Sequence, residues 1–506
     1  MSQKLYLILF CLVILLGFVL RVLPLLHDSF YFTMDQGNDA VHVREILISR
    51  KILLRGPETG IEGVFHGALW YYFISIGYAL FSGHPAGAVF MMILLNLALT
   101  AIIMRKISQN ISSPVALIVG AALQVFWWFY DNSRYAFNPF PLVFLSFILV
   151  FFLVDYLAGK KKSFIWAAIP VGLAFHCESA GAVAFAAFYF LVGFWGVYSK
   201  RLSLKFLILG ILTLLAFFIP RLISESQSNF SQSKALINEI RDPYGIFSHM
   251  NYQYISIRFK SFFTKRIIPQ NDVLSIILMV VILALYKSVR NKNKFVKRYV
   301  ILCKILIVIS WVWFGSNKGW QSWHTVYIRP LLFVSILMML FELPKKIGWP
   351  ILLVILVSQI VFFRTRYLEY LYPSSDPSVF ANEIASVDWV YQNSQGQGFY
   401  EYNYLPSVLD YPYQYLFWWR GINKYGYLPC EYSSFPGSPK LFLPSAKPFE
   451  QPKRNCGNFR FLVVEPDEHQ ELRNLWLDGA RKGTDLIEEK EIGKIHLEKR
   501  LLFTKQ

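Results

Sequence analysis

Long apolar runs recur along residues 1–363 of this 506-residue chain, and they constrain its fold more than any other feature. A helix needs about 17–25 apolar residues to cross the roughly 30 Å hydrocarbon core of a bilayer. Charged residues make up 16% of the chain, against about 25% in soluble proteins. The sequence therefore predicts a polytopic α-helical membrane domain with about eleven transmembrane helices. The runs lie at 5–26, 86–104, 114–130, 139–157, 163–179, 180–198, 203–223, 271–287, 299–315, 326–343 and 347–363.

The first run is interpreted as a retained membrane span rather than as a signal peptide. No small-residue cleavage site follows it in the segment RVLPLLHDSF, and many equally apolar runs come later. We therefore expect residues 5–26 to form the first transmembrane helix.

One further apolar run, residues 66–81, is short, and its placement fixes the orientation of every later loop. If it crossed the membrane, the basic clusters of the loops would lie outside, against the bias of Lys and Arg toward the cytoplasm. We therefore predict that it lies in the interface, that the N-terminus is cytoplasmic and that the protein is in the plasma membrane. The cytoplasmic basic clusters are then 105–106, 160–162, 200–205, 287–298 and 345–346. The outer side holds 27–85, 131–138, 224–270, 316–325 and the residues from 364 onward.

The formal charge of +18 follows largely from this topology. Basic loops contact anionic lipid head groups, so the charge does not indicate a nucleic-acid partner. The sequence contains no HExxH, CxxC, P-loop or GxGxxG motif, and thus no recognisable metalloprotease or nucleotide site.

Residues 364–506 change character, because short β-like runs alternate with turn-rich stretches such as SSFPGSPK. They predict a small soluble α/β domain on the extracytoplasmic side. Cys430 and Cys456 both belong to it, and they leave two alternatives, a disulfide or two free thiols.

Polar residues gather in the predicted outer loops, where four loops on one face can build one cleft. Asp35 precedes the helix predicted for AVHVREILISRKIL, whereas Asp39 or Asn38 is also a plausible N-cap of that helix. His176 and Glu178 lie where a span ends, so they have a functional role or pair with a neighbour. Arg329 either binds phosphate or extends its charge to the interface. The further candidates are Gln36, His66, Arg134, Asn138, Glu225, Lys318 and His324.

These features together resemble the membrane glycosyltransferases of the GT-C type, within the protein O-mannosyltransferase and lipid A aminoarabinose transferase group. The resemblance covers about residues 5–345 and rests on an acidic motif in the first outer loop, the stretch HGALWYYFISIGYALFSGHP, the stretch SRYAFNPFPLVF and the segment PRLISESQSNF. The group has an Asp-Glu pair in the first outer loop. This chain has Asp35-Gln36 at that place, so the second carboxylate is missing there.

The resemblance implies a transferase that uses a polyprenyl-phosphate sugar on the outer face. Asp35 would be the general base of an inverting transfer to a lipid, glycan or protein acceptor. Asp39 would be a second acid or a metal ligand. A cation or a divalent metal would stabilise the leaving phosphate, and the donor-binding candidates are Arg134, Lys318, His324 and Arg329.

Two other classes of function stay open at this point. A lipid-linked oligosaccharide transporter or polymerase-like protein would bind such lipids without a base, and a scaffold would bind a partner through its outer domain. A transporter expects charged residues along a path among its spans. Here the ionisable residues collect at one surface, which favours the transferase.

Overall fold

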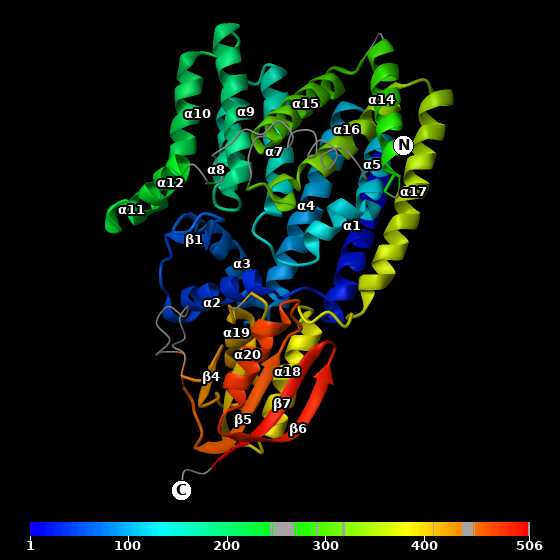
Figure 1. The fold of residues 1–506 in the computed structure, drawn as a ribbon. Coiled ribbons are helices and arrows are strands. Elements are labelled where there is room, and N and C mark those ends of the chain that lie inside the picture. Colours follow the sequence, from blue (N-terminus) through cyan, green and yellow to red (C-terminus); the bar gives the residue numbers. More distant parts are fainter. Residues whose placement is uncertain are drawn as a thin grey trace.

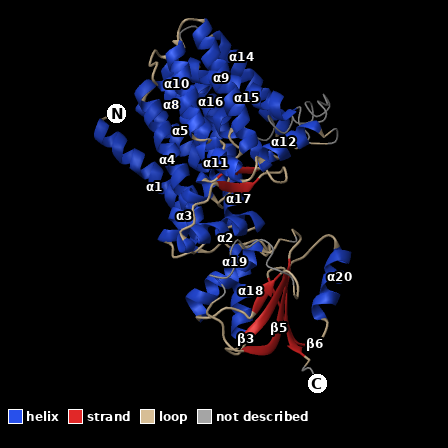
Figure 2. Cartoon of the chain, turned by 90° about the vertical axis from the view of Figure 1, so that its left-hand side faces the viewer, coloured by secondary structure: helices blue, strands red, loops and turns tan. Residues whose placement is uncertain are grey.

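The structure is a computed structural model, and it describes residues 1–242, 245, 268–269, 271–289, 292–315, 319–407, 409–437, 449 and 451–503. The described chain forms three layers (Figures 1 and 2). A bundle of long helices lies at one end, and a five-stranded sheet with its helices lies at the other. A thin layer of shorter helices and a hairpin lies between them.

The bundle contains a helix in each of the predicted apolar runs. Its long and medium helices are α1 (Gln3–Leu26), α4 (Ala86–Asn110), α5 (Ser113–Val125), α7 (Pro141–Leu157), α8 (Ser163–Ala174), α9 (Ser179–Tyr198), α10 (Leu204–Ala216), α14 (Asp272–Ser288), α15 (Lys294–Gly315), α16 (Ile328–Glu342) and α17 (Lys345–Leu371). Single turns are α6 (Trp127–Tyr130), η1 (Asp131–Ser133) and η2 (Ser322–Thr325).

Five of the described helices are long and apolar enough to cross a membrane: α1, α4, α9, the segment η2–α16, and α17. The number rises to seven if two bent pairs each count as one span. These pairs are α5 with residues 127–133, bent by 75°, and α10 with α11 (Ile219–Gln227), bent by 50°. The apolar helices support a membrane fold, whereas the total of about eleven spans stays a prediction.

Apolar side chains fill the bundle, and one buried cation joins its first helices. Arg21 of α1 is 3% exposed. Its guanidinium donates to Ser133 Oγ (3.0 Å) and to Gln124 Oε1 (2.8 Å). A third bond reaches Asn96 Oδ1 (2.8 Å). Because each acceptor lies on a different element, the charge is satisfied by neutral oxygens that fix α1, α4, α5 and η1 to one another.

The middle layer holds the first outer loop. It consists of α2 (Met34–Ser49), the antiparallel strands β1 (Arg55–Glu58) and β2 (Phe65–Gly67), and α3 (Leu69–Leu80). With 12 residues, α3 is only about 18 Å long at 1.5 Å per residue. Helix α8 has the same length, so length does not decide between an interfacial helix and a span, and the interfacial position of α3 stays a prediction together with the orientation of the chain.

Two short helices after the bend at the end of α10 lie against this hairpin. Pro220 in the first turn of α11 has no N–H to donate, which accounts for the break after α10. Ser224 of α11 accepts a hydrogen bond from Arg55 Nε (2.5 Å). Gln232 of α12 (Ser231–Arg241) accepts one from the Phe65 N–H (3.1 Å). The far end of α10 is thereby tied to the first outer loop.

Residues from Phe380 onward form a mixed five-stranded sheet with the strand order β4-β3-β5-β7-β6. The strands are β3 (Gly398–Tyr404), β4 (Glu431–Ser433), β5 (Cys456–Val464), β6 (Thr484–Ile492) and β7 (Ile495–Leu502). The helices are α18 (Phe380–Asn393), α19 (Tyr411–Arg420), the π-helical turn η3 (Gly421–Tyr425) and α20 (Gln470–Arg481). Helix α17 continues to Leu371, beyond the predicted boundary at 363/364.

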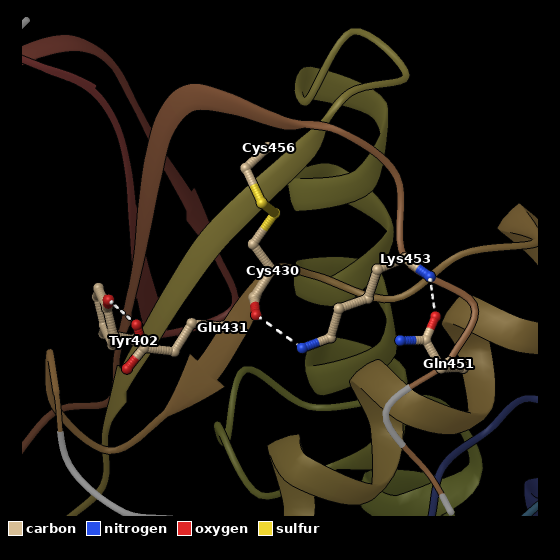
Figure 3. Close-up of a disulfide and its surroundings, with 6 residues drawn as sticks. All are labelled: Tyr402, Cys430, Glu431, Gln451, Lys453 and Cys456. Carbon is tan, nitrogen blue, oxygen red and sulfur yellow. Dashed lines mark hydrogen bonds between the residues drawn. A yellow bond between two sulfur atoms is a disulfide. The ribbon is translucent and has the colours of Figure 1, made fainter. Parts of the chain in front are cut away.

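A disulfide joins Cys430 to Cys456 across this sheet (Figure 3). It connects the start of β4 with the first residue of β5, and β3 lies between these two strands. Lys453 Nζ donates to the Cys430 carbonyl (3.0 Å), which holds the same two chain segments together. The structure therefore contains the first of the two alternatives for this cysteine pair.

The sheet unit is joined to the middle layer by main-chain hydrogen bonds. The Phe32 N–H donates to the Ser378 carbonyl (3.0 Å), and the Phe380 N–H donates to the Phe30 carbonyl (2.9 Å). The residues just before α2 are thereby paired with the segment that enters α18.

Helix α19 provides a second junction. The Tyr415 hydroxyl donates to the Gly83 carbonyl (2.7 Å), and Trp419 Nε1 donates to the Ser82 carbonyl (3.0 Å). From the α2 side, the Arg44 guanidinium lies 4.8 Å from the ring of Trp418. Helix α19 is therefore in contact with both α2 and the loop after α3.

Candidate functional site

Helix α2 begins earlier than the sequence predicts, so Asp35 lies in its first turn and not before it. Thr33 is the N-cap residue, and its N–H donates to Gln36 Oε1 (3.0 Å) in a capping box. Gln36 Nε2 donates to the Ala136 carbonyl (2.9 Å). Gln36 therefore fixes the start of α2 and its contact with the second outer loop (131–138), and both ends of its amide are engaged.

The Asp35 carboxylate makes no hydrogen bond or ion pair within the described residues, and its side chain is exposed. Nearby protein atoms still remove part of its hydration, and this desolvation raises the pKa of Asp35 above its usual range. The bond of the adjacent Gln36 to the Ala136 carbonyl brings Asp35 near the second outer loop, where its charge acts on the Tyr135 hydroxyl. An accessible carboxylate with a raised pKa is suited to accept a proton.

Asp39 has the opposite environment, although it lies only one turn farther along α2. Its side chain is 4% exposed and accepts a hydrogen bond from Trp70 Nε1 (2.6 Å). Burial raises the pKa of Asp39 well above its usual range, and the nearby Asp35 charge raises it further. Asp39 is inside the helix and does not cap it, so it holds α3 against α2.

Two of the predicted donor-binding arginines, Arg134 and Arg329, stack on aromatic rings. Arg134 is 8% exposed and donates to Asp131 Oδ1 (3.0 Å). Its guanidinium also stacks 3.7 Å from the centre of the Tyr370 ring. Arg329, at the start of α16, stacks 3.9 Å from the ring of Trp128. The Arg134 charge is thus already compensated by a carboxylate and held against an aromatic ring.

The structure gathers four other predicted residues, His66, His176, Glu178 and His324, into one cluster. Glu178 lies at its centre, between β2 and η2. The distance from His66 Nε2 to Glu178 Oε2 is 3.9 Å, and the distance from His324 Nε2 to Glu178 Oε1 is also 3.9 Å. Both distances exceed an ordinary hydrogen bond. We call His66, Glu178 and His324 the imidazole–carboxylate cluster.

The proton positions in this cluster follow from its backbone contacts. The Ser179 N–H donates to His66 Nδ1 (3.1 Å), so in the neutral ring the proton is on Nε2. The Gln321 N–H approaches His324 Nδ1 (3.3 Å) in the same way. Both rings therefore direct an Nε2–H group toward the Glu178 carboxyl group.

His176 and Asn138 hold the chain around the cluster. His176 Nε2 bonds to the Phe217 carbonyl (2.9 Å), and the Leu69 N–H donates to His176 Nδ1 (3.3 Å). Asn138 Nδ2 donates to the Cys177 carbonyl (2.6 Å). The second outer loop is therefore connected to Asp35 through residues 135–136 and to the cluster through Asn138.

Arg221 is a residue of this region that sequence analysis does not single out, because it falls inside a predicted span. In the structure it belongs to α11, beyond the bend, and its charge acts on both His66 and His176. Its guanidinium makes no hydrogen bond within the described chain. Pro220, directly before it, is the sequence signal that would have placed it outside the span.

Glu225 has a structural role. Its carboxylate accepts hydrogen bonds from the N–H groups of Gln232 (3.2 Å) and Ser233 (2.9 Å) at the start of α12. The Ser233 hydroxyl donates a third (2.6 Å). Glu225 therefore caps the first turn of α12.

Lys318 lies outside the described residues. Within the residues that are described, no group of three or more His, Cys, Asp or Glu side chains has a geometry that could hold a metal ion.

Comparison with known proteins supports the predicted resemblance. Residues 66–223 match the model of the family described as dolichyl-phosphate-mannose-protein mannosyltransferase. This range contains His66, the second outer loop, Glu178 and Arg221, while Asp35 and His324 lie outside it. No curated protein matches the chain in sequence.

Two solved structures have the same fold over almost the whole chain. ArnT from Cupriavidus metallidurans bound to undecaprenyl phosphate aligns with a TM-score of 0.58 at 13% identity, over 98% of each chain. The same protein in the apo state aligns with a TM-score of 0.60 at 13% identity, over 99% of this chain and 98% of that one.

The fold and the partial family match point to the same class of proteins. They confirm the predicted resemblance to the GT-C type of membrane glycosyltransferases. Within that class, the chain resembles the protein O-mannosyltransferase family in residues 66–223 and the aminoarabinose transferase ArnT in overall fold.

Proposed function

We propose that this protein is a membrane glycosyltransferase that moves a sugar from a polyprenyl-phosphate carrier to an acceptor on the extracytoplasmic face. The family model supports the reaction class, and the ArnT structure with undecaprenyl phosphate supports a carrier of this kind. The observation that carries the proposal is Asp35, an exposed carboxylate without a partner among the described residues, beside the second outer loop.

Asp35 is the general base in this proposal. The acceptor hydroxyl attacks the anomeric carbon of the sugar, the bond from that carbon to the phosphate oxygen breaks, and the hydroxyl proton passes to the Asp35 carboxylate. Attack opposite the leaving phosphate inverts the configuration at the anomeric carbon. The partly desolvated position of Asp35 raises its pKa, which makes it a stronger base than a fully hydrated aspartate.

The donor phosphate is assigned to the imidazole–carboxylate cluster with Arg221. The Nε2–H groups of His66 and His324 converge there, and Arg221 supplies a permanent charge that makes no ion pair within 4 Å among the described residues, although the Glu225 charge acts on it. Arg134 fits this role less well, because its charge is already paired with Asp131. Convergent donors of this type stabilise the charge that develops on a leaving phosphate.

A lipid carrier also needs an apolar approach to this region, and α11 provides one. Ile219, Leu222 and Ile223 of α11 are exposed, with fractions of 53%, 61% and 43%. The same short helix carries Arg221 toward His66. A helix with an apolar outer side and a cation toward the protein suits a ligand that has an apolar tail and an anionic head.

A transfer assay tests the proposal. Purified protein in lipid nanodiscs is given radiolabelled polyprenyl-phosphate sugars, with membrane glycolipids and exported proteins as acceptors. Transfer of label that is abolished or strongly reduced by Asp35→Asn is expected. Binding of the carrier lipid without any transfer, over a broad set of sugars and acceptors, would favour a transporter instead.

A further inference from the structure

The Glu178 carboxyl group lies between the imidazoles of His66 and His324, where an anionic ligand of the cluster would also bind. We infer that ionised Glu178 competes with the donor phosphate for the Nε2–H groups of His66 and His324, so that the carrier lipid binds when Glu178 is protonated. This inference rests on the proposed function, because it assigns the donor phosphate to the same cluster.

The geometry shows why the two anions exclude one another. Glu178 Oε1 accepts a hydrogen bond from the Ala180 N–H (3.1 Å), which fixes the carboxyl group at the start of α9. Each of its oxygens is 3.9 Å from one imidazole Nε2. A phosphate oxygen that bonds to both Nε2–H groups must therefore lie next to this carboxyl group. Two anions at that distance in a buried site repel strongly.

Among the described residues, Arg221 is the permanent cation that faces the cluster, and its charge acts on His66 and His176. Glu178 is 5% exposed, and His66 is also 5% exposed. Both imidazoles are tied through Nδ1 to backbone N–H groups, so protonation of either ring breaks an existing bond. The titratable and charged groups that face the cluster are His66 from β2, His176 and Cys177 from the loop before α9, Arg221 from α11 and His324 from η2.

The ionisation of Glu178 is set within the physiological range. Burial raises the pKa of Glu178 to about 7, against the opposing effect of the hydrogen bond from Ala180. Burial also lowers the pKa of His66 to about 3, with Arg221 adding to the effect, so this ring is neutral in the free protein. Near neutral pH, the site can therefore change its charge through Glu178 while the His66 ring stays a neutral donor.

If this inference holds, the protein takes up a proton when it binds the carrier phosphate. At pH 8, Glu178 is mostly ionised in the free protein, so binding of the carrier phosphate adds about one proton to the complex. Above pH 7, the dissociation constant is expected to rise about tenfold for each pH unit, because each unit lowers the protonated fraction tenfold. In the protonated state, Glu178 changes from a competitor into an additional O–H donor.

The test uses undecaprenyl phosphate and the full chain in nanodiscs. Calorimetric titrations at pH 8 in two buffers of different ionisation enthalpy give the number of protons taken up by the wild-type protein. Dissociation constants between pH 6 and pH 8.5 are then compared for the wild type, Glu178→Gln and Glu62→Gln. Glu62 is an exposed carboxylate of the first outer loop, outside the cluster, and serves as the matched control.

Glu178→Gln keeps a carbonyl oxygen for the Ala180 N–H but cannot ionise. We expect its affinity to vary with pH only through the ligand phosphate, whose second pKa is about 6. At pH 8.5 it should bind at least tenfold more tightly than the wild type, while Glu62→Gln follows the wild type. Equal pH dependence in the wild type and Glu178→Gln, or no proton uptake by the wild type, would overturn the inference.

These results also separate the inference from the proposed function. If undecaprenyl phosphate binds with an affinity that does not depend on Glu178, the inference is wrong, but the proposed transferase function is not affected. Absence of binding at pH 6, where Glu178 is protonated, contradicts the assigned donor and therefore both. The proton count in the wild type needs no variant, so it holds even if Glu178→Gln folds poorly.

Discussion

Two aspartates one turn apart on α2 differ in every property that matters for catalysis. Asp35 is exposed and without a partner among the described residues, whereas Asp39 is buried and bound to Trp70. The first side chain can approach a substrate, and the second is enclosed by protein. Of these two aspartates, Asp35 is therefore the one that we propose as the base.

Replacement of Asp35 by Asn tests this difference. The variant keeps the size of the side chain but cannot accept a proton at neutral pH, so we expect transfer to fall by about 10² to 10⁴. Affinity for undecaprenyl phosphate should stay within about twofold, because the phosphate is assigned to other residues. Initial rates with labelled donor, together with binding measurements, check both expectations. Full activity with unchanged binding would exclude Asp35 as the base.

Asp39→Asn is the matched variant on the same helix. Its amide oxygen can still accept the hydrogen bond from Trp70, and a neutral side chain suits the buried site. We therefore expect activity within about threefold of the wild type and a similar thermal midpoint. A loss as large as that of Asp35→Asn would instead assign Asp39 a direct part in the reaction.

At the scale of single residues, the sequence predicted the local helix start poorly and could not predict which distant side chains meet. The capping box of Thr33 and Gln36 has a legible T-x-x-Q pattern, which would have placed Asp35 inside the helix. A single sequence does not show that His66, Glu178 and His324 lie close together, because these residues come from three distant segments. Only the packing of those segments brings them together.

Helices α2 and α19 pack closely against each other. A Cβ added to Gly37 of α2 would lie 2.4 Å from the backbone nitrogen of Pro412 in α19. Gly37→Ala should therefore force the helices apart and lower the free energy of unfolding by about 1–3 kcal/mol. Denaturation of the purified protein measures the loss, and transfer activity should fall with it because α2 carries Asp35.

Gly60 of the same outer loop provides the control. A Cβ added there meets nothing within 4 Å. Gly60→Ala should leave stability within about 0.5 kcal/mol of the wild type, as surface substitutions usually do. Equal stability of the two variants would show that the packing of α2 on α19 contributes little.

Strand β7 contains a buried ion pair between Glu498 and Arg500, and we expect its contribution to the free energy of unfolding to depend on pH. Burial acts to raise the pKa of Glu498, but hydrogen bonds from His496, Arg481 and Arg500 outweigh it and hold the pKa at about 2. A carboxylate with a lowered pKa stabilises the fold above its unfolded value of 4.5 and loses that effect as pH falls toward 2. Glu498→Gln should cost about 3 kcal/mol at pH 7.

Unfolding of the wild type and Glu498→Gln by urea, at pH 7 and at pH 3, measures this dependence. The difference between the two proteins should shrink at pH 3, where the wild-type carboxylate loses most of its advantage over the unfolded chain. A difference of the same size at both pH values would mean that packing, and not charge, holds this part of the sheet.

The lengths of the apolar runs predicted where helices occur, but they did not predict where the helices are interrupted. The run 114–130 is broken at Phe126 without a proline or glycine to signal it. The run 203–223 is broken near Pro220, a signal that apolar content masked. Such bends depend on what the chain packs against, and a hydropathy pattern contains no information about the partner surface.

The positions of the basic loops predict how the whole molecule lies in its membrane. If the bundle is embedded with the N-terminus in the cytoplasm, reporters fused after Leu26 and after Gln506 should both be extracytoplasmic. Reporters after Lys161 and Lys292 should be cytoplasmic. Alkaline phosphatase and fluorescent-protein fusions distinguish the two sides. A cytoplasmic C-terminus would show that residues 66–81 cross the membrane and would invert every later loop.

The pairing of residues 30–32 with 378–380 has a consequence for how the protein is made. The segment that leads into α2 finds its backbone partners only after more than three hundred further residues have been synthesised. During translation, the Phe32 N–H and the Phe30 carbonyl therefore lack these partners until residues 378–380 have been made. Asp35 and its surroundings therefore reach their final arrangement late, when residues 378–380 have been synthesised and have paired with residues 30–32.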